Sequence, residues 1–414
     1  MSFKFSSFSI GRFINFETYR DAVLAEALKK TSPYKKPAVN RLKRTSGNVV
    51  DGVRPPRPAR KVETKYKRPP DNFVSKEWRE RFGLGELEEH FAAAEQLSPD
   101  NYVGRMHELL WTEELQSEKD LLQYSMEDVR MTPSRGGAML ILEIPGLSES
   151  RPSVLFGDSI LVTATGQREG RSYRGYVHQV ERDSAFLKFH NQFHSTFVPN
   201  SRWDVEFELN RSSIRQCHFG VDSSQRLLKS TSAAMYIFPT SVSAPTSVVS
   251  DFPITFKPIN RNLNRRQLTV VSQILAQSNG TCPYLIFGPP GTGKTTTLIE
   301  AIMQFHISRP NSRILICAPG NDAADLLLRK LSTSISTSDM VRIHAYQRNK
   351  NDVDEVTMRY SVYDDSVNAF ASKTLDELTR KKFVVCTCIM ASKLQNLKEG
   401  SQLQPRLYPE SVTT

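Results

Sequence analysis

The stretch Tyr284-Leu-Ile-Phe-Gly-Pro-Pro-Gly-Thr-Gly-Lys-Thr-Thr-Thr-Leu298 decides what fold the rest of the chain is expected to have. Its first four residues are an apolar run typical of a buried strand, and a helix is predicted from Thr295 to about Phe305. The turn between them fits the pattern G-x-x-x-x-G-K-[ST], in which a glycine-rich backbone wraps around phosphate groups. A Gly/Pro-rich surface turn is the alternative, but it would not need a strand before it and a helix after it. The stretch therefore predicts a site for a nucleoside triphosphate.

The positions of this loop have separate expected roles. Glycines allow a close backbone approach and conformations that a Cβ forbids, and the helix N-terminus directs positive charge at the anion. Lys294 is expected to reach the β- and γ-phosphates, and the Thr295 hydroxyl to bind Mg²⁺, so these two are the predicted catalytic residues. The predicted nucleotide-binding loop consists of Gly288, Pro289, Pro290, Gly291, Thr292, Gly293, Lys294, Thr295 and Thr296.

Composition and charge limit the class of protein. Among the 414 residues, 39% are hydrophobic and 24% charged, which is typical of a soluble chain. No apolar run reaches about eighteen residues, so no membrane partner is expected. The five cysteines show no disulfide-like spacing, and a reducing compartment is expected.

The positive charge is concentrated at the start of the chain. Residues 1–70 hold 17 Lys/Arg and 5 Asp/Glu, a net charge of +12, whereas residues 71–414 hold 38 and 39, a net charge of −1. A basic arm of this kind favours nucleic acid, because binding releases counterions from the phosphates. A solvated tail with no dedicated partner is the alternative.

Between the arm and the loop, the hydrophobic period changes from helix to strand. Several short strand candidates follow one another from residue 138 to residue 209, which predicts a small β-barrel. His190 and His194 have a spacing that could ligate a metal from a helix, but they lie among strands without a third ligand, so no metal site is predicted there. From residue 259 helices and strands alternate, which predicts a mostly parallel sheet.

The fold class is therefore α/β plus all-β. The predicted parts are a disordered basic arm (1–75), a helical segment (76–135), a β-barrel (136–222), a connector (223–257), a partial RecA-like phosphate-loop domain (258–395) and an unstructured tail (396–414).

Three motifs of the last domain resemble those of superfamily 1 helicases. Leu263-Asn-Arg-Arg-Gln267 is similar to the glutamine motif that reads adenine, and an amide can pair with adenine N6 and N7. Ile314-Leu-Ile-Cys-Ala-Pro-Gly-Asn-Asp-Ala-Ala-Asp-Leu326 resembles a strand-to-helix turn that touches the nucleic-acid backbone, and Phe383-Val-Val-Cys-Thr-Cys-Ile-Met-Ala-Ser392 resembles the next motif. The resemblance implies ATP as the nucleotide, Gln267 at its base, and RNA contacts at Pro319, Asn321, Thr387 and Ser392. Gly320 and Asp322 replace two serines usual in the family, and Asp322 would repel phosphate.

Further stretches narrow the resemblance to one family. Leu109-Leu-Trp-Thr-Glu-Glu-Leu-Gln116, Leu142-Glu-Ile-Pro-Gly-Leu147, Arg151-Pro-Ser-Val-Leu-Phe-Gly-Asp158 and Gly175-Tyr-Val-His178 resemble the Armitage and Moloney-leukaemia-virus-10-like RNA helicases of the Upf-like group. The resemblance runs from about residue 97 to about residue 394. It implies an ATP-dependent 5′ to 3′ RNA helicase that works in RNA silencing. It also implies silencing proteins as partners. The basic arm beside the barrel predicts that single-stranded RNA is bound largely independently of sequence, through its backbone. A monomer in the cytoplasm, with its ribonucleoprotein granules, is expected.

Phosphoryl transfer also needs an acid pair at a strand end, and usually an arginine from a second motor domain. The two Asp-Glu pairs, Asp354-Glu355 and Asp376-Glu377, both precede the Phe383–Thr387 strand, and neither ends an apolar strand. We therefore expect a helicase truncated after its third motif, with Tyr284–Phe287 unpaired and apolar at the surface. A catalytically inactive product that only binds RNA or a partner is the alternative, and an incomplete gene product is a third reading.

Overall fold

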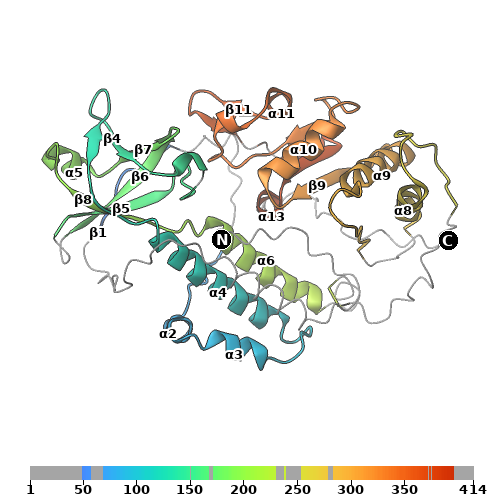
Figure 1. Cartoon of the computed structure of the whole chain (residues 1–414). Helices are drawn as coiled ribbons and strands as arrows, with labels where there is room; N and C mark the ends of the chain where they lie inside the picture. The colour runs from blue at the N-terminus through green and yellow to red at the C-terminus, as the bar shows by residue number, and fades with distance from the viewer. Residues whose placement is uncertain are drawn as a thin grey trace.

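The computed structural model describes residues 49–56, 69–149, 151–166, 171–229, 237–238, 253–277, 283–371, 373 and 375–395. Most of the predicted basic arm, and the predicted tail from residue 396, lie outside the described residues. The described part consists of a β-barrel, a layer of long helices and an α/β half (Figure 1). Among the described residues, no helix combines the length and the apolar character that a bilayer crossing requires.

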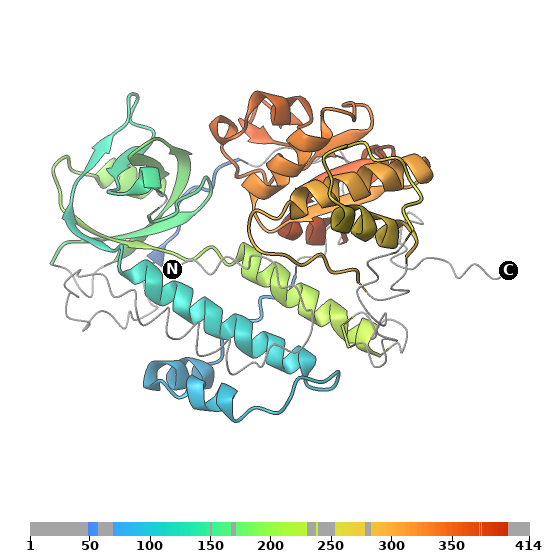
Figure 2. The same ribbon diagram turned by 45° about the vertical axis from the view of Figure 1, so that its right-hand side comes forward.

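The barrel is one eight-stranded sheet, as predicted. Its strands run in the order β2-β8-β5-β6-β7-β4-β3, and β1 pairs separately with β6. The two ends of this path, β2 and β3, are consecutive in the chain with only Arg130 between them, so the sheet curls back on itself into the ring seen in Figure 2. The strands are β1 (Val49–Val50), β2 (Met126–Val129), β3 (Met131–Pro133), β4 (Leu140–Glu143), β5 (Ser159–Ala164), β6 (Ser172–Val180), β7 (Ser184–Lys188) and β8 (Trp203–Phe207).

A short helix, α5 (Asn191–Thr196), fills one end of the barrel. Its Phe193 packs on Phe189 with ring centroids 4.4 Å apart, and both side chains are buried in the barrel core. The two histidines whose spacing resembled a metal site hold this helix in place. His190 Nδ1 accepts a hydrogen bond from Gln192 N at 3.2 Å, and His194 Nε2 accepts one from Phe189 N at 3.1 Å. No group of metal-ligating side chains occurs among the described residues.

Two long helices run side by side beneath the barrel and the α/β half (Figures 1 and 2). The first is α4 (Tyr102–Leu122), which lies within the segment predicted to be helical. The second, α6 (Ser212–Leu228), was not predicted, and it crosses the boundary that the sequence placed between barrel and connector. A charged pair, Arg211 Nε to Glu114 Oε1 at 2.5 Å, joins α4 to the residue before α6, and Glu114 is buried. The shorter α2 (Lys76–Leu84) and α3 (Leu87–Ala92) pack outside α4.

The α/β half is built on a parallel sheet of three strands in the order β10-β13-β9. One face packs on α9 and α10, and α13 lies on the other. Its strands are β9 (Ile314–Ala318), β10 (Met340–Arg342) and β13 (Phe383–Thr387), and a small hairpin joins β11 (Tyr363–Asp364) and β12 (Ala369–Phe370). Its helices are α8 (Arg265–Leu275), α9 (Lys294–Ser308), α10 (Asn321–Leu331), α11 (Glu355–Arg359), α12 (Leu375–Thr379) and α13 (Cys388–Gln395). A short 3₁₀ turn, η2 (Lys350–Asp352), precedes α11, and another, η1 (Leu147–Glu149), follows β4 of the barrel.

The predicted strand Tyr284–Phe287 is wrong as a strand. The segment pairs with no strand, and the Tyr284 hydroxyl donates to Gln273 Oε1 of α8 at 2.6 Å instead. A strand needs a neighbour to satisfy its backbone, and the described sheet ends at β9. Phe287 is 80% exposed and Leu285 44%, which confirms the expectation of an unpaired apolar segment at the surface.

Residues 49–56 form an ordered strap across the barrel, which corrects the prediction that disorder extends to residue 75. Strand β1 pairs in parallel with β6, and Asp51 accepts hydrogen bonds from Arg174 Nη1 and the Tyr176 hydroxyl, both at 3.0 Å. Gly52 lies so close to the barrel that a Cβ there would sit 2.4 Å from Arg174 O and 2.7 Å from Lys188 O.

A buried ion-pair network organises one end of the α/β sheet. The Asp325 carboxylate of α10 accepts from Arg342 Nε at 2.8 Å and from Arg348 Nη2 at 2.6 Å. Burial alone would raise the pKa of Asp325, but the hydrogen bonds from Arg348 and Arg342 outweigh burial and lower it. We call Asp325, Arg342 and Arg348 the Asp325 network.

His344 adjoins this network. Its Nδ1 lies 3.0 Å from Arg348 Nη1, which can only donate, so Nδ1 is the acceptor and Nε2 carries the proton toward Ser361 Oγ at 2.8 Å. Burial, and then the charges of Arg342 and Arg348, lower the pKa of His344 to about 3. The imidazole is therefore neutral across the ordinary pH range.

Replacing Gly52 with Ala should release the strap, because the new Cβ would collide with two backbone carbonyls rather than with movable side chains. We expect faster tryptic cleavage of the basic stretch after Arg54 and a lower unfolding midpoint for the barrel. Gly220→Ala is the matched control. Gly220 lies within α6 with open space around it, and Ala there should stabilise the helix by up to about 1 kcal/mol. Equal cleavage rates in both variants would contradict a tightly held strap.

His344→Gln should reduce the acid sensitivity of the α/β half. The unfolded chain takes up a proton at this histidine near pH 6.5, whereas the folded chain does so only near pH 3, so stability falls as pH drops through this window. Between pH 7 and pH 5 this single group should cost about 2 kcal/mol of unfolding free energy. Urea unfolding of both proteins at the two pH values measures the difference, and an identical loss in the variant would refute the assignment.

Candidate nucleotide and RNA site

The glycine-rich loop has the backbone that a phosphate cradle needs. Gly291 and Gly293 have φ angles of 82° and 81°, in the left-handed region that favours glycine, and α9 begins immediately afterwards at Lys294. A Cβ on Gly293 would lie 2.6 Å from Gln267 Nε2, so a side chain there would push the Gln267 amide away from the loop. The loop therefore leads directly into a helix N-terminus, as the sequence predicts.

Lys294 lies across the mouth of its own loop. Its Nζ donates to Gly288 O at 2.6 Å and to Pro289 O at 2.9 Å. Phosphate oxygens are stronger acceptors for an ammonium group than these carbonyls, so the lysine is placed to exchange one set of partners for the other. Thr295 is half-buried in the first turn of α9, and its hydroxyl could complete a Mg²⁺ shell. The loop, Lys294 and Thr295 thus fit a magnesium-bound nucleoside triphosphate.

Gln267 ties α8 to this loop. Its Oε1 accepts from Asn264 N at 2.9 Å, while Asn264 Oδ1 accepts from Gln267 N at 3.0 Å, which together form a capping box. Its Nε2 donates to Thr292 O at 3.2 Å. Both ends of the amide are therefore engaged, and reading an adenine would require Gln267 to exchange these bonds. The structure does place the residue directly beside the loop.

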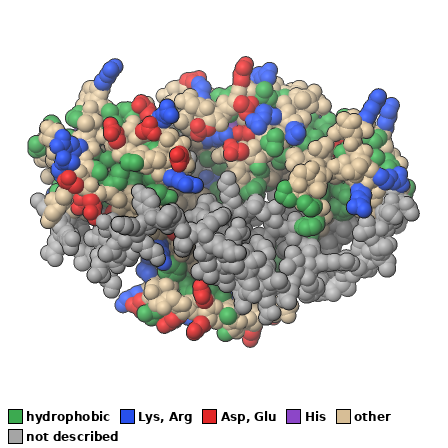
Figure 3. Space-filling model, in the orientation of Figure 1, with side chains coloured by type: hydrophobic (Ala, Val, Ile, Leu, Met, Phe, Trp, Pro, Cys, Tyr) green, Lys and Arg blue, Asp and Glu red, His purple; other side chains and the backbone are tan. Residues whose placement is uncertain are grey.

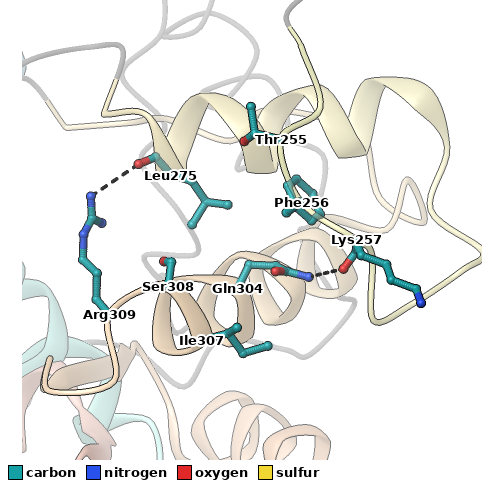
Figure 4. Close-up of a pocket in the computed structure, with 8 residues that line it drawn as sticks. All are labelled: Thr255, Phe256, Lys257, Leu275, Gln304, Ile307, Ser308 and Arg309. Carbon is teal, nitrogen blue, oxygen red and sulfur yellow. Dashed lines mark hydrogen bonds between the residues drawn. The ribbon is translucent and has the colours of Figure 1, made fainter.

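A buried carboxylate on α9 holds the segment that precedes α8. Glu300 Oε1 accepts from Ile259 N at 2.8 Å, and Oε2 accepts from Asn260 N at 3.0 Å. One turn later, Gln304 Nε2 donates to Lys257 O at 2.8 Å, as the dashed line in Figure 4 shows. The sequence pattern does not predict this role of Glu300, because a single Glu in a helix resembles a solvated side chain.

A cavity of about 530 Å³ opens beside this anchor (Figure 4). It lies between residues 255–257 and the carboxyl ends of α8 and α9, where Leu275, Ile307 and Arg309 line it. The phosphate loop lies at the amino end of α9, so this cavity is at the far end of the same helix and is not the nucleotide site.

The four residues assigned to RNA have different surroundings. Thr387 ends β13 in register with Ala318 of β9, so Pro319 follows at the same edge of the sheet and is exposed. Asn321, half-buried, begins α10, and its Oδ1 accepts from Arg342 Nη2 at 3.1 Å. Ser392 is engaged elsewhere, because its hydroxyl donates to Ile389 O and contacts Gln216 Oε1 of α6 at 3.1 Å. Pro319, Asn321 and Thr387 thus flank one edge, while Ser392 joins α13 to α6.

Neither Asp-Glu pair lies at the end of a sheet strand. Asp354 caps α11 by accepting from Thr357 N at 3.0 Å and pairs with Arg329 at 2.7 Å. Although burial acts in the opposite direction, the hydrogen bonds from Thr357 and Arg329 lower its pKa to about 2. The second pair lies within α12. Their placement agrees with the expectation that neither serves the phosphate loop.

Comparison with known families matches the two halves of the chain separately. Residues 124–207 match the β-barrel domain of helicase MOV-10, and residues 262–401 match the AAA domain family. The first range coincides with β2 through β8, and the second contains Gln267, the phosphate loop and the RNA-assigned turn.

Named relatives give the same assignment. The helicase mov-10-B.1 of Danio rerio is 38% identical over 316 residues, covering 75% of this chain and 30% of the relative. Helicase MOV-10 of Gallus gallus is 32% identical over 401 residues, covering 94% and 40%. The RNA helicase armi of Drosophila melanogaster is 29% identical over 284 residues, covering 64% and 23%. The chain spans less than half the length of each relative. These matches confirm the resemblance drawn from the motifs, and the chain belongs to the MOV-10 and Armitage-like helicase family.

Proposed function

We propose that this chain is the N-terminal portion of an ATP-dependent RNA helicase of the RNA-silencing type. The observation that carries the proposal is the phosphate loop, which runs through two left-handed glycines into α9 with Lys294 as the first helical residue. Gln267 adjoins the loop through Thr292, which supports ATP as the nucleotide. Bound nucleotide would draw Lys294 away from the carbonyls of Gly288 and Pro289 and would use the Thr295 hydroxyl for Mg²⁺.

The proposed RNA surface combines the barrel with the edge formed by Pro319, Asn321 and Thr387. On the face in Figure 3, acidic and basic side chains are interspersed over both halves rather than gathered into a basic stripe. The net charge of residues 71–414 is −1, so most electrostatic attraction would come from the basic arm. Backbone contacts of this kind do not distinguish bases, which supports single-stranded RNA bound largely independently of sequence. Silencing proteins as partners, a monomeric state and a cytoplasmic location belong to the same proposal.

A second candidate function is RNA binding without ATP turnover. It is favoured by the placement of Asp354 and Glu355 at the start of α11 and of Asp376 and Glu377 in α12, because neither pair follows a strand of the parallel sheet. RNA-stimulated ATP hydrolysis by the purified 414-residue chain, lost in Lys294→Ala, would support the function as an enzyme. Nucleotide binding without hydrolysis would support RNA binding without ATP turnover.

Lys294→Ala should reduce ATP binding by at least about tenfold, because it removes the charge that faces the β- and γ-phosphates. Titration of a fluorescent ATP analogue into both proteins measures this loss. Lys330→Ala, at an exposed lysine near the end of α10, is the control and should leave affinity unchanged. ATP should also bind more tightly than GTP, and equal affinities would remove Gln267 from the adenine role.

Deleting residues 1–48 should flatten the salt dependence of RNA binding while leaving the strap intact. The deleted stretch holds 10 Lys/Arg and 3 Asp/Glu, a net charge of +7. Each phosphate neutralised in single-stranded RNA contributes about −0.7 to the slope of log K against log salt. We therefore expect a clearly shallower slope over 50–200 mM salt. A slope equal to that of the full chain would show that residues 1–48 are a solvated tail.

A further inference from the structure

The amide of Asn321 has a fixed orientation. Arg342 Nη2 lies 3.1 Å from Asn321 Oδ1, and a guanidinium group can only donate hydrogen bonds. The oxygen of the amide must therefore face Arg342, and the Nδ2 amino group must face the opposite way. Among the described residues, Asn321 Nδ2 has no hydrogen-bond partner, so the side chain presents a donor that the protein itself does not use.

The group that imposes this orientation cannot easily move. The side chain of Arg342 is 0% exposed. Besides the bond to Asn321, the Arg342 guanidinium donates to Asp325 Oδ1 at 2.8 Å and to Ile343 O at 2.6 Å. Asp325 Oδ2 in turn accepts a hydrogen bond from Arg348 Nη2. A guanidinium with three partners in the protein interior leaves Asn321 one amide orientation with a satisfied acceptor.

The unused donor lies on the turn that leads from β9 into α10. Pro319 and Gly320 are exposed on this turn, and the Gly320 cap supplies no side-chain oxygen to the helix. The adjacent Asp322 is exposed, and its carboxylate repels anions. An anionic ligand at this turn would therefore need neutral donors held in place, since the local charge does not attract it.

We propose that Arg342 is a positioning residue that fixes the Asn321 amide so that Nδ2 donates to a phosphate oxygen of RNA. Arg342 does not itself touch the RNA, since its guanidinium is buried behind Asn321. Asp325 and Arg348 act one step further back, by fixing Arg342. The inference rests on the proposed RNA-binding function and adds to it the direction of the donor and the residue that sets it.

Asn321→Asp separates this role from simple stability. The aspartate can accept from Arg342 as the amide oxygen does, and with a charge-assisted bond, so the turn should remain folded. It removes only the outward donor and adds one negative charge. Ala323→Asp is the matched control, because Ala323 is exposed in the first turn of the same helix and the change adds the same charge while keeping the donor.

RNA affinity is measured with a fluorescent single-stranded oligonucleotide at fixed salt, alongside melting temperature. We expect Asn321→Asp to bind at least about tenfold more weakly than Ala323→Asp, with an unchanged or higher melting temperature, since a hydrogen bond to a charged group is among the stronger ones. Equal affinities in the two variants would overturn the proposal, because the loss would then reflect charge alone.

Arg342 is tested by Arg342→Lys in a cycle with Asn321→Ala. Lysine keeps the charge but cannot bridge Asn321 and Asp325 with a planar fork. RNA affinity should fall about as far as in Asn321→Ala, ATP affinity should not change, and the double variant should be no weaker than either single one. Additive losses would overturn the proposal, and if Arg342→Lys does not fold, the Asn321→Asp comparison decides. A wild-type chain that binds ATP but no RNA would refute the proposed RNA function itself, whereas RNA binding with additive losses refutes only the inference.

Discussion

The α/β half depends on one buried carboxylate. Asp325 is 3% exposed and is held by two guanidinium groups that come from different segments, Arg342 at the end of β10 and Arg348 in the loop that follows. Removing one member of such a buried set typically costs about 3–5 kcal/mol, because the remaining charges lose their compensation. The same loop continues to the barrel, where a Cβ on Gly157 would lie 3.2 Å from Gln347 Nε2. The Asp325 network thus holds together the start of α10, the end of β10 and the segment that meets the barrel.

A second buried carboxylate, that of Glu300, is stabilised by hydrogen bonds from uncharged donors. Glu300 is 3% exposed and is satisfied by two backbone N–H groups and by Gln304 Nε2, so its charge is stabilised by dipoles alone. This arrangement fixes the segment before α8 onto the phosphate-loop helix, and the capping box of Asn264 and Gln267 then follows at a set distance from the loop. The proposed nucleotide site and the proposed RNA surface of the α/β half therefore each depend on a buried carboxylate that is not itself among the residues proposed to bind the ligand.

The sequence predicts those parts of the structure that depend on a local pattern, such as the alternation of apolar residues or the position of glycines. Burial alternates along the barrel strand β7, and β13 has the predicted bounds, while the glycines of the phosphate loop predict its left-handed turns. Tyr284–Phe287 fails as a strand because no described strand lies beside it, which agrees with the expectation that this segment is unpaired. The prediction of disorder for the strap is wrong for a different reason. Its surroundings are Pro-rich and basic, and only a few residues within it, Asp51 and Gly52 among them, fit the barrel. Asp325 stood within a quoted motif, but only the fold shows that Arg342 and Arg348 surround it.

The two halves of the molecule meet through residues that the motifs assign to other tasks. Ser392 lies in a motif associated with RNA, yet its hydroxyl contacts Gln216 on α6, the helix that runs on from the barrel. The one hydroxyl proton of Ser392 can be donated either to Ile389 O, at 2.8 Å, or to Gln216 Oε1, at 3.1 Å, so an RNA phosphate at Ser392 would have to compete with both acceptors. Asn321 does not face this conflict, because Arg342 occupies only its oxygen. RNA that reached both residues would therefore compete with the contact between Ser392 and Gln216, whereas RNA at Pro319, Asn321 and Thr387 alone would leave that contact in place.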